Sequence, residues 1–320
     1  MSFSKLINFI KDDGNESFLL VAHERPDGDT ISSILAMGEL LRFFGKRVET
    51  VSSEGVPEVF KYIPNSASVK SDFLLGDFDA VILLDNGDLK RTGFLERIIL
   101  AKDRHLTIIN IDHHPKNNIW KLAKINLVNE KASATCEIIY QLHLKMGVPV
   151  SPEIATTLLS GIYTDTGGFQ HQNVSSKTLR VVSELLSHGA KLKIISENVS
   201  GQRSITMLKL WGLALSRIKK VAGLPLVYSI ITKADIKNIG AKEADLAGVV
   251  NLIASTPDEQ ATILLYELPN GKIKGSLRTE SSKIDVAKLA ELFAGGGHRK
   301  AAGFVVEGKM ICDGERWRIV

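Results

Sequence analysis

Histidine and aspartate residues gather in four short segments of the sequence, at 23–29 (His-Glu-Arg-Pro-Asp-Gly-Asp), Asp85, 112–114 (Asp-His-His) and Asp165. Carboxylates that converge in one place repel one another and resist burial unless a cation neutralises them. Mixed imidazole and carboxylate ligands suit Mn²⁺, Fe²⁺ or Co²⁺ better than Ca²⁺, which prefers oxygen alone. Two such ions about 3.5–4 Å apart can share a carboxylate and clamp both oxygens of an in-line phosphoryl displacement.

Each segment taken alone also has an ordinary structural explanation. An aspartate after a strand is usually a helix N-cap or a turn residue, and for Asp85 by itself this explanation is the stronger one. For His113 and His114 alone, a surface loop and a ligand pair explain the residues equally well. All four segments fall at predicted strand or helix ends, so one shared site explains them better than four unrelated roles.

The elements that must position these residues alternate between strand and helix in the first half of the chain. A helical pattern covers residues 31–44, and apolar runs predict strands at 18–22, 48–51, 80–84 and 107–111. Continuous apolar strands between helices predict an α/β fold with a mostly parallel sheet covered by helices on both faces. Ligands gather at the carboxyl ends of the strands in such sheets, where three of the polar segments begin.

A length of 320 residues and a change of pattern along the chain predict two domains. Helices at 134–146, 152–163 and 176–186 complete an N-terminal domain of residues 1–190, with Ser133 and Thr135 as expected helix caps. Residues 191–215 are predicted to be a helical linker. Strands at 226–232, 261–268 and 273–278 and a helix at 286–293 then predict a smaller α/β domain of residues 216–320, with a cleft between the domains.

A second candidate site is the glycine-rich segment 295–300 (Gly-Gly-Gly-His-Arg-Lys). Consecutive glycines let backbone N–H groups approach a phosphate or a base closely, and His298 and the cations beside it supply hydrogen bonds and charge. Three glycines by themselves are more often a flexible turn. Arg278 ends a predicted strand, and the hairpin pattern alone favours a solvated charge on an edge strand.

In combination and in order, these segments resemble the DHH phosphoesterase superfamily, which includes RecJ-like exonucleases and family II pyrophosphatases. The resemblance is carried by His23-x-x-Pro-Asp27-Gly-Asp29 and by Asp112-His113-His114. It implies one metal held by His23, Asp27 and Asp85, and a second held by Asp29, Asp85, His113 and Asp165. It also implies that Asp85 bridges the two ions and that Asp112, which does not contact the metal, orients a histidine by a hydrogen bond. His114 would face the substrate, so that Asp85 and His114 are the implied catalytic residues.

The segment 275–278 together with the glycine-rich segment resembles the DHHA1 domain of nanoRNase/pAp-phosphatase-like proteins. This resemblance implies that the substrate nucleotide is bound by Arg278, Gly296, Gly297 and His298. The implied enzyme is a hydrolase with two Mn²⁺, or Mg²⁺ or Co²⁺. A hydroxide activated by both ions would convert short oligoribonucleotides to 5′-mononucleotides, or 3′-phosphoadenosine 5′-phosphate to AMP. The alternatives are linear or cyclic dinucleotides, then inorganic pyrophosphate, then nucleotide binding without turnover.

The composition limits the partners. A formal net charge of +4 suits an acidic substrate but gives no basic stripe for long nucleic acid. Apolar runs long enough to span a bilayer and the features of a signal peptide are both missing from the sequence, so we expect a cytoplasmic protein that avoids membranes. Cys136 and Cys312 stand far apart, which argues against a disulfide scaffold or a cysteine zinc site. The family resemblance suggests a homodimer.

Overall fold

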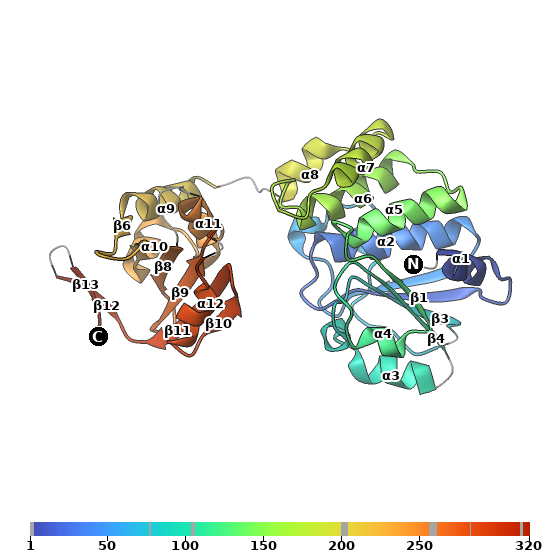
Figure 1. The fold of residues 1–320 in the computed structure, drawn as a ribbon, viewed down its shortest axis with the longest axis horizontal. Helices are drawn as coiled ribbons and strands as arrows, with labels where there is room; N and C mark the ends of the chain where they lie inside the picture. The colour runs from blue at the N-terminus through green and yellow to red at the C-terminus, as the bar shows by residue number, and fades with distance from the viewer. Residues whose placement is uncertain are drawn as a thin grey trace. The chain divides into compact units, whose positions relative to one another are not determined.

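The chain divides into two compact units, Met1–Gln202 and Arg203–Val320, in a computed structural model (Figure 1). The structure describes residues 3–76, 78–103, 106–199, 204–255, 261–281, 283–313 and 316–320. In this part of the chain, no helix combines the length and apolar character needed to cross a membrane.

The first unit is built on a sheet of five parallel strands in the order β2-β1-β3-β4-β5. The strands are β1 (Ser17–Val21), β2 (Arg47–Val51), β3 (Ala80–Leu84), β4 (Thr107–Asp112) and β5 (Ile125–Val128). The helices are α1 (Phe3–Lys11), α2 (Gly28–Phe43), α3 (Leu95–Asp103), α4 (Ile119–Leu122), α5 (Thr135–Met146), α6 (Pro152–Asp165), α7 (Ser176–Ser187) and α8 (Leu192–Val199). Short 3₁₀ turns are η1 (Glu58–Phe60), η2 (Ser66–Ser68) and η3 (Leu89–Thr92).

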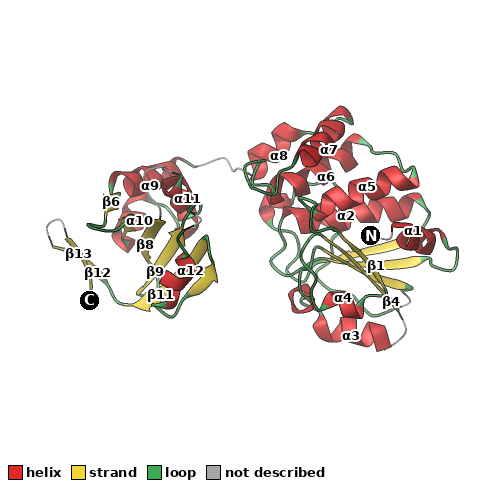
Figure 2. Ribbon diagram, viewed as in Figure 1, coloured by secondary structure: helices red, strands yellow, loops and turns green. Residues whose placement is uncertain are grey.

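Both faces of this sheet are covered by helices, as Figure 2 shows, with α2, α5 and α6 on one side and α3 and α4 on the other. Successive side chains of a strand point to opposite faces. Phe18 and Leu20 of β1 therefore enter the core beneath α2, whereas Leu19 and Val21 enter the core beneath α3. This two-sided burial explains why the strands are continuously apolar, and it confirms the predicted α/β class.

The strand order creates a switch point between β1 and β3. From β1 the chain moves outward to β2, whereas from β3 it moves outward in the other direction through β4 to β5. The connections after β1 and β3 therefore diverge, and in sheets of this kind ligands bind at the carboxyl ends of two such strands. His23 follows β1 and Asp85 follows β3 directly, so the topology places both at this switch point.

The second unit has a mixed six-stranded sheet in the order β10-β11-β9-β8-β7-β6, in which β7 and β8 are parallel and the other neighbours are antiparallel. Its strands are β6 (Lys219–Lys220), β7 (Leu226–Ile231), β8 (Ala261–Glu267), β9 (Lys272–Arg278), β10 (Gly296–His298) and β11 (Ala301–Glu307), with a separate pair β12 (Met310–Asp313) and β13 (Arg316–Ile319). Its helical segments are α9 (Ile205–Ser216), α10 (Lys233–Ile239), η4 (Glu243–Leu246), α11 (Val249–Ala254) and α12 (Val286–Glu291).

Two helices occupy the region predicted as a helical linker. Ile195 of α8 is buried in the main core of the first unit. Leu210 and Trp211 of α9 are buried with Ile231 in a core of the second unit. Each helix therefore packs into one unit, and residues 200–203 between them lie outside the described residues.

The end of α12 contains a backbone conformation that alanine tolerates poorly. Gly295 N donates to Ala290 O at 2.9 Å and Ala294 N donates to Glu291 O at 3.0 Å, which is the hydrogen-bond pattern of a Schellman motif. Ala294 has φ of 55°, in the left-handed region where a Cβ atom is unfavourable. Glycine is the residue that this position favours.

We expect Ala294→Gly to increase the free energy of unfolding of the full chain by up to about 1 kcal/mol, because relief of the left-handed strain exceeds the added chain entropy. Urea denaturation measures the change. Ala287→Gly, inside α12, is the matched control and should lower stability by about 0.5–1 kcal/mol. A lower unfolding midpoint for Ala294→Gly would contradict the strain assigned to this position.

Candidate metal centre

His23 lies where β1 ends and is almost fully buried. Its Nδ1 is 2.6 Å from Glu24 O, so the backbone carbonyl fixes the ring and leaves Nε2 for a ligand. Nε2 is 3.6 Å from Asp27 Oδ2 and 3.9 Å from Asp85 Oδ2. Asp27 is the N-cap of α2, with Oδ1 accepting from Thr30 N. The three side chains form a group whose potential ligand atoms lie within 4.8 Å of one another.

Asp85 lies at the centre of the cluster and is only 1% exposed. Its Oδ2 faces His23, whereas its Oδ1 is 3.4 Å from His113 Nε2 and 3.5 Å from His114 Nδ1. Its φ of 60° is left-handed, although Asp85 N still bonds to Ile111 O at 3.0 Å as a continuation of the sheet. Strained backbone of this kind collects at functional sites, where the surrounding structure enforces it.

His113 joins the cluster to the end of α6. Its Nε2 is 3.1 Å from Asp165 Oδ2, and its Nδ1 is 3.4 Å from Ala132 O. Asp165 is the last residue of α6, and Asp29 lies in the first turn of α2. Asp29, His113 and Asp165 form a second group with ligand atoms within 4.8 Å of one another, and Asp85, His113 and His114 form a third. The shared Asp85 and His113 make the groups contiguous.

Asp112 is fully buried at the end of β4 and holds the residues around it. Its Oδ1 accepts from His114 N at 2.9 Å and lies 2.8 Å from His114 Nδ1, while its Oδ2 accepts from Gly87 N at 3.0 Å. The carboxylate therefore fixes both the His114 ring and the turn that follows Asp85. With Nδ1 occupied, Nε2 is the nitrogen of His114 that can reach a substrate, and the side chain is 36% exposed.

The structure thus brings together, in one cluster, the eight residues that the four segments contributed to the prediction: His23, Asp27, Asp29, Asp85, Asp112, His113, His114 and Asp165. They come from the ends of β1, β3 and β4, the start of α2 and the end of α6. Their individual roles as metal ligands stay a prediction.

The electrostatics of the cluster favour a cation. Burial raises the pKa of Asp29 to about 7 and that of Asp165 to about 6, and burial also raises the pKa of Asp85. Burial lowers the pKa of His113, but the carboxylates of Asp165 and Asp85 outweigh it and raise that pKa to about 12. A cation bound among these groups would stabilise the ionised carboxylates and the neutral imidazole.

His113 Nε2 supplies a second sign that these residues fit a metal ion. This atom is buried and makes no well-aligned hydrogen bond with the described residues, although Asp165 Oδ2 lies 3.1 Å away. Ligation would satisfy the nitrogen, and a divalent cation would neutralise the carboxylates. The mixed nitrogen and oxygen donors are those of a transition-metal site. The cluster is therefore compatible with metal binding.

Two threonines, Thr30 and Thr135, contribute to the cluster although the sequence did not single them out for it. Thr30 Oγ1 donates to Asp85 Oδ2 at 2.9 Å, and Thr135 Oγ1 donates to Asp85 Oδ1 at 3.1 Å. The expected capping role of Ser133 and Thr135 is wrong, since Ala134 stands at the N-cap of α5. The Ser133 hydroxyl instead donates to Glu137 Oε2 at 3.0 Å. No local sequence signal distinguishes a threonine that binds a distant carboxylate from a cap.

The predicted substrate residues lie close together in the second unit. The register of β10, β11 and β9 places His298 opposite Ala301 and Ala301 opposite Arg278. Arg278 Nε donates to Asn251 Oδ1 at 2.8 Å, and Nη1 donates to Leu277 O at 2.9 Å. Because β9 lies between β11 and β8, the interpretation of Arg278 as an edge-strand charge is wrong.

Residues 296–298 of the glycine-rich segment form the strand β10, and a turn follows at 299–300. A Cβ on Gly295 would lie 2.3 Å from Gly303 O, and one on Gly297 would lie 2.6 Å from Ala301 O. Both glycines are therefore required by the close approach of β11. At Gly296 a Cβ would meet no atom within 4 Å, so this is the glycine whose surroundings leave room for a ligand.

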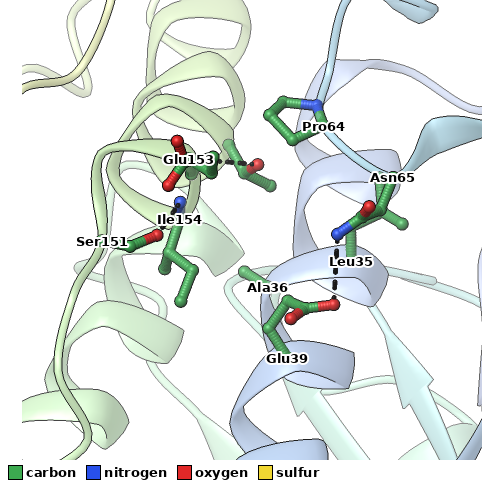
Figure 3. Close-up of a pocket in the computed structure, with 9 residues that line it drawn as sticks. Leu35, Ala36, Glu39, Pro64, Asn65, Ser151, Glu153 and Ile154 are labelled. Atoms are coloured by element: carbon green, nitrogen blue, oxygen red, sulfur yellow. Dashed lines mark hydrogen bonds between the residues drawn. The ribbon is translucent and has the colours of Figure 1, made fainter.

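A pocket of about 210 Å³ in the first unit is a separate feature (Figure 3). Its lining comes from the middle of α2, the turn at Pro64-Asn65 and the first turns of α6. The Asn65 side chain donates to Glu39 Oε1 there at 3.2 Å. The His/Asp cluster instead lies around the first turn of α2 and the last residue of α6.

The fold and the cluster define a phosphoesterase of the DHH type. Residues 17–162 match the DHH family, N-terminal domain, and residues 223–312 match the DHHA1 domain. The chain belongs to this family and is a hydrolase that acts on phosphate esters.

Several proteins resemble the chain over nearly its whole length. The bifunctional oligoribonuclease and PAP phosphatase NrnA of Thermus thermophilus is 27% identical, over 90% of this chain and 84% of that protein. The protein of the same name from Mycoplasma genitalium is 27% identical, over 96% and 93% respectively. The crystal structure of an exopolyphosphatase-related protein from Bacteroides fragilis has a TM-score of 0.81 at 28% identity and covers 96% of this chain and 92% of its own.

Metal binding to the metal-free chain should release protons and strengthen with pH. His113 is protonated up to about pH 12, Asp29 up to about pH 7 and Asp165 up to about pH 6, and each must lose its proton to ligate. Apparent Mn²⁺ affinity should rise about tenfold per pH unit for each proton released, with more protons released near pH 6 than near pH 8. Calorimetry in buffers of different ionisation enthalpy counts the protons. An affinity independent of pH would contradict ligation by these groups.

Proposed function

We propose that the chain hydrolyses short oligoribonucleotides to 5′-mononucleotides and 3′-phosphoadenosine 5′-phosphate to AMP, with two Mn²⁺ ions as its cofactor. The observation that carries this proposal is the buried Asp85 carboxylate. Its Oδ2 faces the group that contains His23, and its Oδ1 faces the group that contains His113. The names of the NrnA relatives support the two substrates. We also propose, from family resemblance, a homodimer that works in the cytoplasm.

In this proposal His23, Asp27 and Asp85 would hold one ion, and Asp29, Asp85, His113 and Asp165 would hold the other. Bound metal ions supply a water nucleophile of lowered pKa and neutralise the charge that develops on the phosphate. The backbone carbonyls behind His23 and His113 set the ring orientations that such ligation needs.

His114 and Asp112 complete the reaction centre as proposed. The hydrogen bond to Asp112 raises the pKa of His114 above its ordinary value, which favours the imidazolium. An imidazolium at this place donates a proton to the leaving oxygen or stabilises charge on the phosphate. Asp112 keeps the ring in position through Nδ1, which leaves Nε2 for the substrate.

The second unit supplies the nucleotide contacts in this proposal. Arg278 pairs with phosphate through the guanidinium donors that Asn251 and Leu277 leave available. The open space at Gly296 admits a ligand close to the backbone, beside Gly297 and His298. Contacts to a terminal nucleotide suit short substrates better than long polymers.

A product profile of the full chain with Mn²⁺ tests the proposed substrates. Short RNA should yield 5′-mononucleotides, and 3′-phosphoadenosine 5′-phosphate should yield AMP and phosphate. Linear diadenylate and pyrophosphate are the comparison substrates. Turnover of pyrophosphate alone, or tight nucleotide binding without any product at saturating Mn²⁺, would overturn the proposal.

Asp85→Asn should lower kcat by roughly 10³-fold or more, because one change disturbs both metal sites. Asparagine accepts the left-handed backbone at this position, so the fold should persist. Asp88→Asn is the matched control, since Asp88 is a nearby N-cap whose Oδ1 accepts from Lys90 N. Steady-state kinetics and circular dichroism check both variants, and near-normal turnover by Asp85→Asn would refute the bridging role.

Arg278→Ala should raise KM about tenfold or more and leave Mn²⁺ affinity unchanged, because it removes a charge-assisted contact to the substrate. Lys274→Ala on the same strand is the matched control, with its ammonium over the Tyr266 ring. Kinetics and metal titration separate the two effects. Unchanged KM in Arg278→Ala would remove this residue from the proposed substrate site.

A further inference from the structure

Each oxygen of the Asp85 carboxylate accepts a hydrogen bond from one threonine hydroxyl. Thr30 Oγ1 donates to Oδ2 at 2.9 Å and Thr135 Oγ1 donates to Oδ1 at 3.1 Å. Both threonines are completely buried. The oxygen bound by Thr30 is the one that faces His23, and the oxygen bound by Thr135 is the one that faces His113. Each carboxylate oxygen therefore accepts from its own threonine, and Oδ2 faces His23 whereas Oδ1 faces His113 and His114.

The same two threonines also bind the neighbouring carboxylates through their backbone. Thr30 N donates to Asp27 Oδ1 at 3.0 Å, and Thr135 N donates to Asp29 Oδ2 at 2.6 Å. Thr30 therefore links Asp85 to a carboxylate of the His23 group, and Thr135 links Asp85 to a carboxylate of the His113 group.

The place of each threonine in its helix makes this possible. A threonine inside a helix commonly turns its hydroxyl back to the carbonyl four residues earlier. Thr156 and Thr157 of α6 do so, with Oγ1 bonded to Pro152 O and Glu153 O. Thr30 is the third residue of α2 and Thr135 is the first residue of α5, so the preceding turn of helix is missing at both. Their hydroxyls are directed to Asp85 instead.

We propose that Thr30 and Thr135 are paired positioning residues that fix the Asp85 carboxylate so that each oxygen faces a different metal ion. A free aspartate rotates broadly about its last torsion, and an ionised carboxylate has about four acceptor positions. The two hydroxyls occupy one position on each oxygen, which leaves one on each for a cation. This arrangement disfavours chelation of a single ion by both oxygens. The inference rests on the proposed two-metal function.

Thr30→Val and Thr135→Val test the inference, because valine keeps the branched shape and removes the hydroxyl. In Mn²⁺ titrations of the metal-free full chain, each should weaken one of the two binding steps about 10–100-fold, the range for residues that orient metal ligands. The two variants should affect different steps, and the double variant should affect both. At saturating Mn²⁺, kcat should remain reduced and substrate KM should change little.

Three controls separate positioning from general structure. Thr30→Ser and Thr135→Ser keep the hydroxyl and should retain Mn²⁺ affinity within about threefold. Thr157→Val removes a buried hydroxyl that bonds only to the Glu153 carbonyl among the described partners, and it should leave both binding steps unchanged. In an Asp85→Asn background, the valine changes should cause no further loss of affinity. Alanine replaces valine wherever circular dichroism shows a folding defect.

The outcomes distinguish this inference from the proposed function. Wild-type Mn²⁺ affinity in both valine variants would overturn the positioning role, whatever the substrate. If both variants weakened the same Mn²⁺-binding step, the assignment of one Asp85 oxygen to each ion would be overturned. A wild-type chain that binds Mn²⁺ in two steps but hydrolyses no phosphate ester would defeat the proposed function, and the titrations would still decide the role of the threonines.

Discussion

Mutual repulsion among buried carboxylates is the constraint on which the rest of the first unit depends. Asp29 and Asp85 are almost completely removed from water, and Asp27 and Asp165 lie beside them. Uncompensated burial of such groups costs several kcal/mol for each charge. The cluster is tolerable because imidazoles, hydroxyls and backbone N–H groups surround it, and its donor atoms are compatible with a neutralising cation.

The fold supplies that compensation mainly from helix N-termini. The first turn of α2 directs Thr30 N to Asp27, and the first turn of α5 directs Thr135 N and Cys136 N to the two oxygens of Asp29. The first N–H groups of a helix have no partner within the helix and carry partial positive charge. The parallel sheet places these helix starts beside the strand ends that carry Asp85 and His113. The unpaired N–H groups of the helices and the buried carboxylates therefore satisfy each other's hydrogen-bonding needs.

The pattern of apolar residues was sufficient to predict the α/β class and most elements of the sheet. Continuous runs such as 80–84 specify strands buried on both faces, and β3 has those same bounds. The glycine-rich segment was harder to interpret, because glycine serves equally in turns and where two strands approach closely. The contact between Gly297 and β11 depends on a strand pairing that local sequence does not encode.

The sequence by itself determined which groups are available for chemistry. Histidines and aspartates at strand ends identified the cluster, because the nitrogen and oxygen atoms that can ligate a metal belong to these residue types wherever they lie. Only the tertiary structure decided how these groups are held. Thr30 and Thr135 are 105 positions apart in the chain, yet their hydroxyls bind the two oxygens of one carboxylate. Such pairing follows from the packing of α2 and α5 at the end of β3, and packing between distant segments leaves no mark on either segment alone.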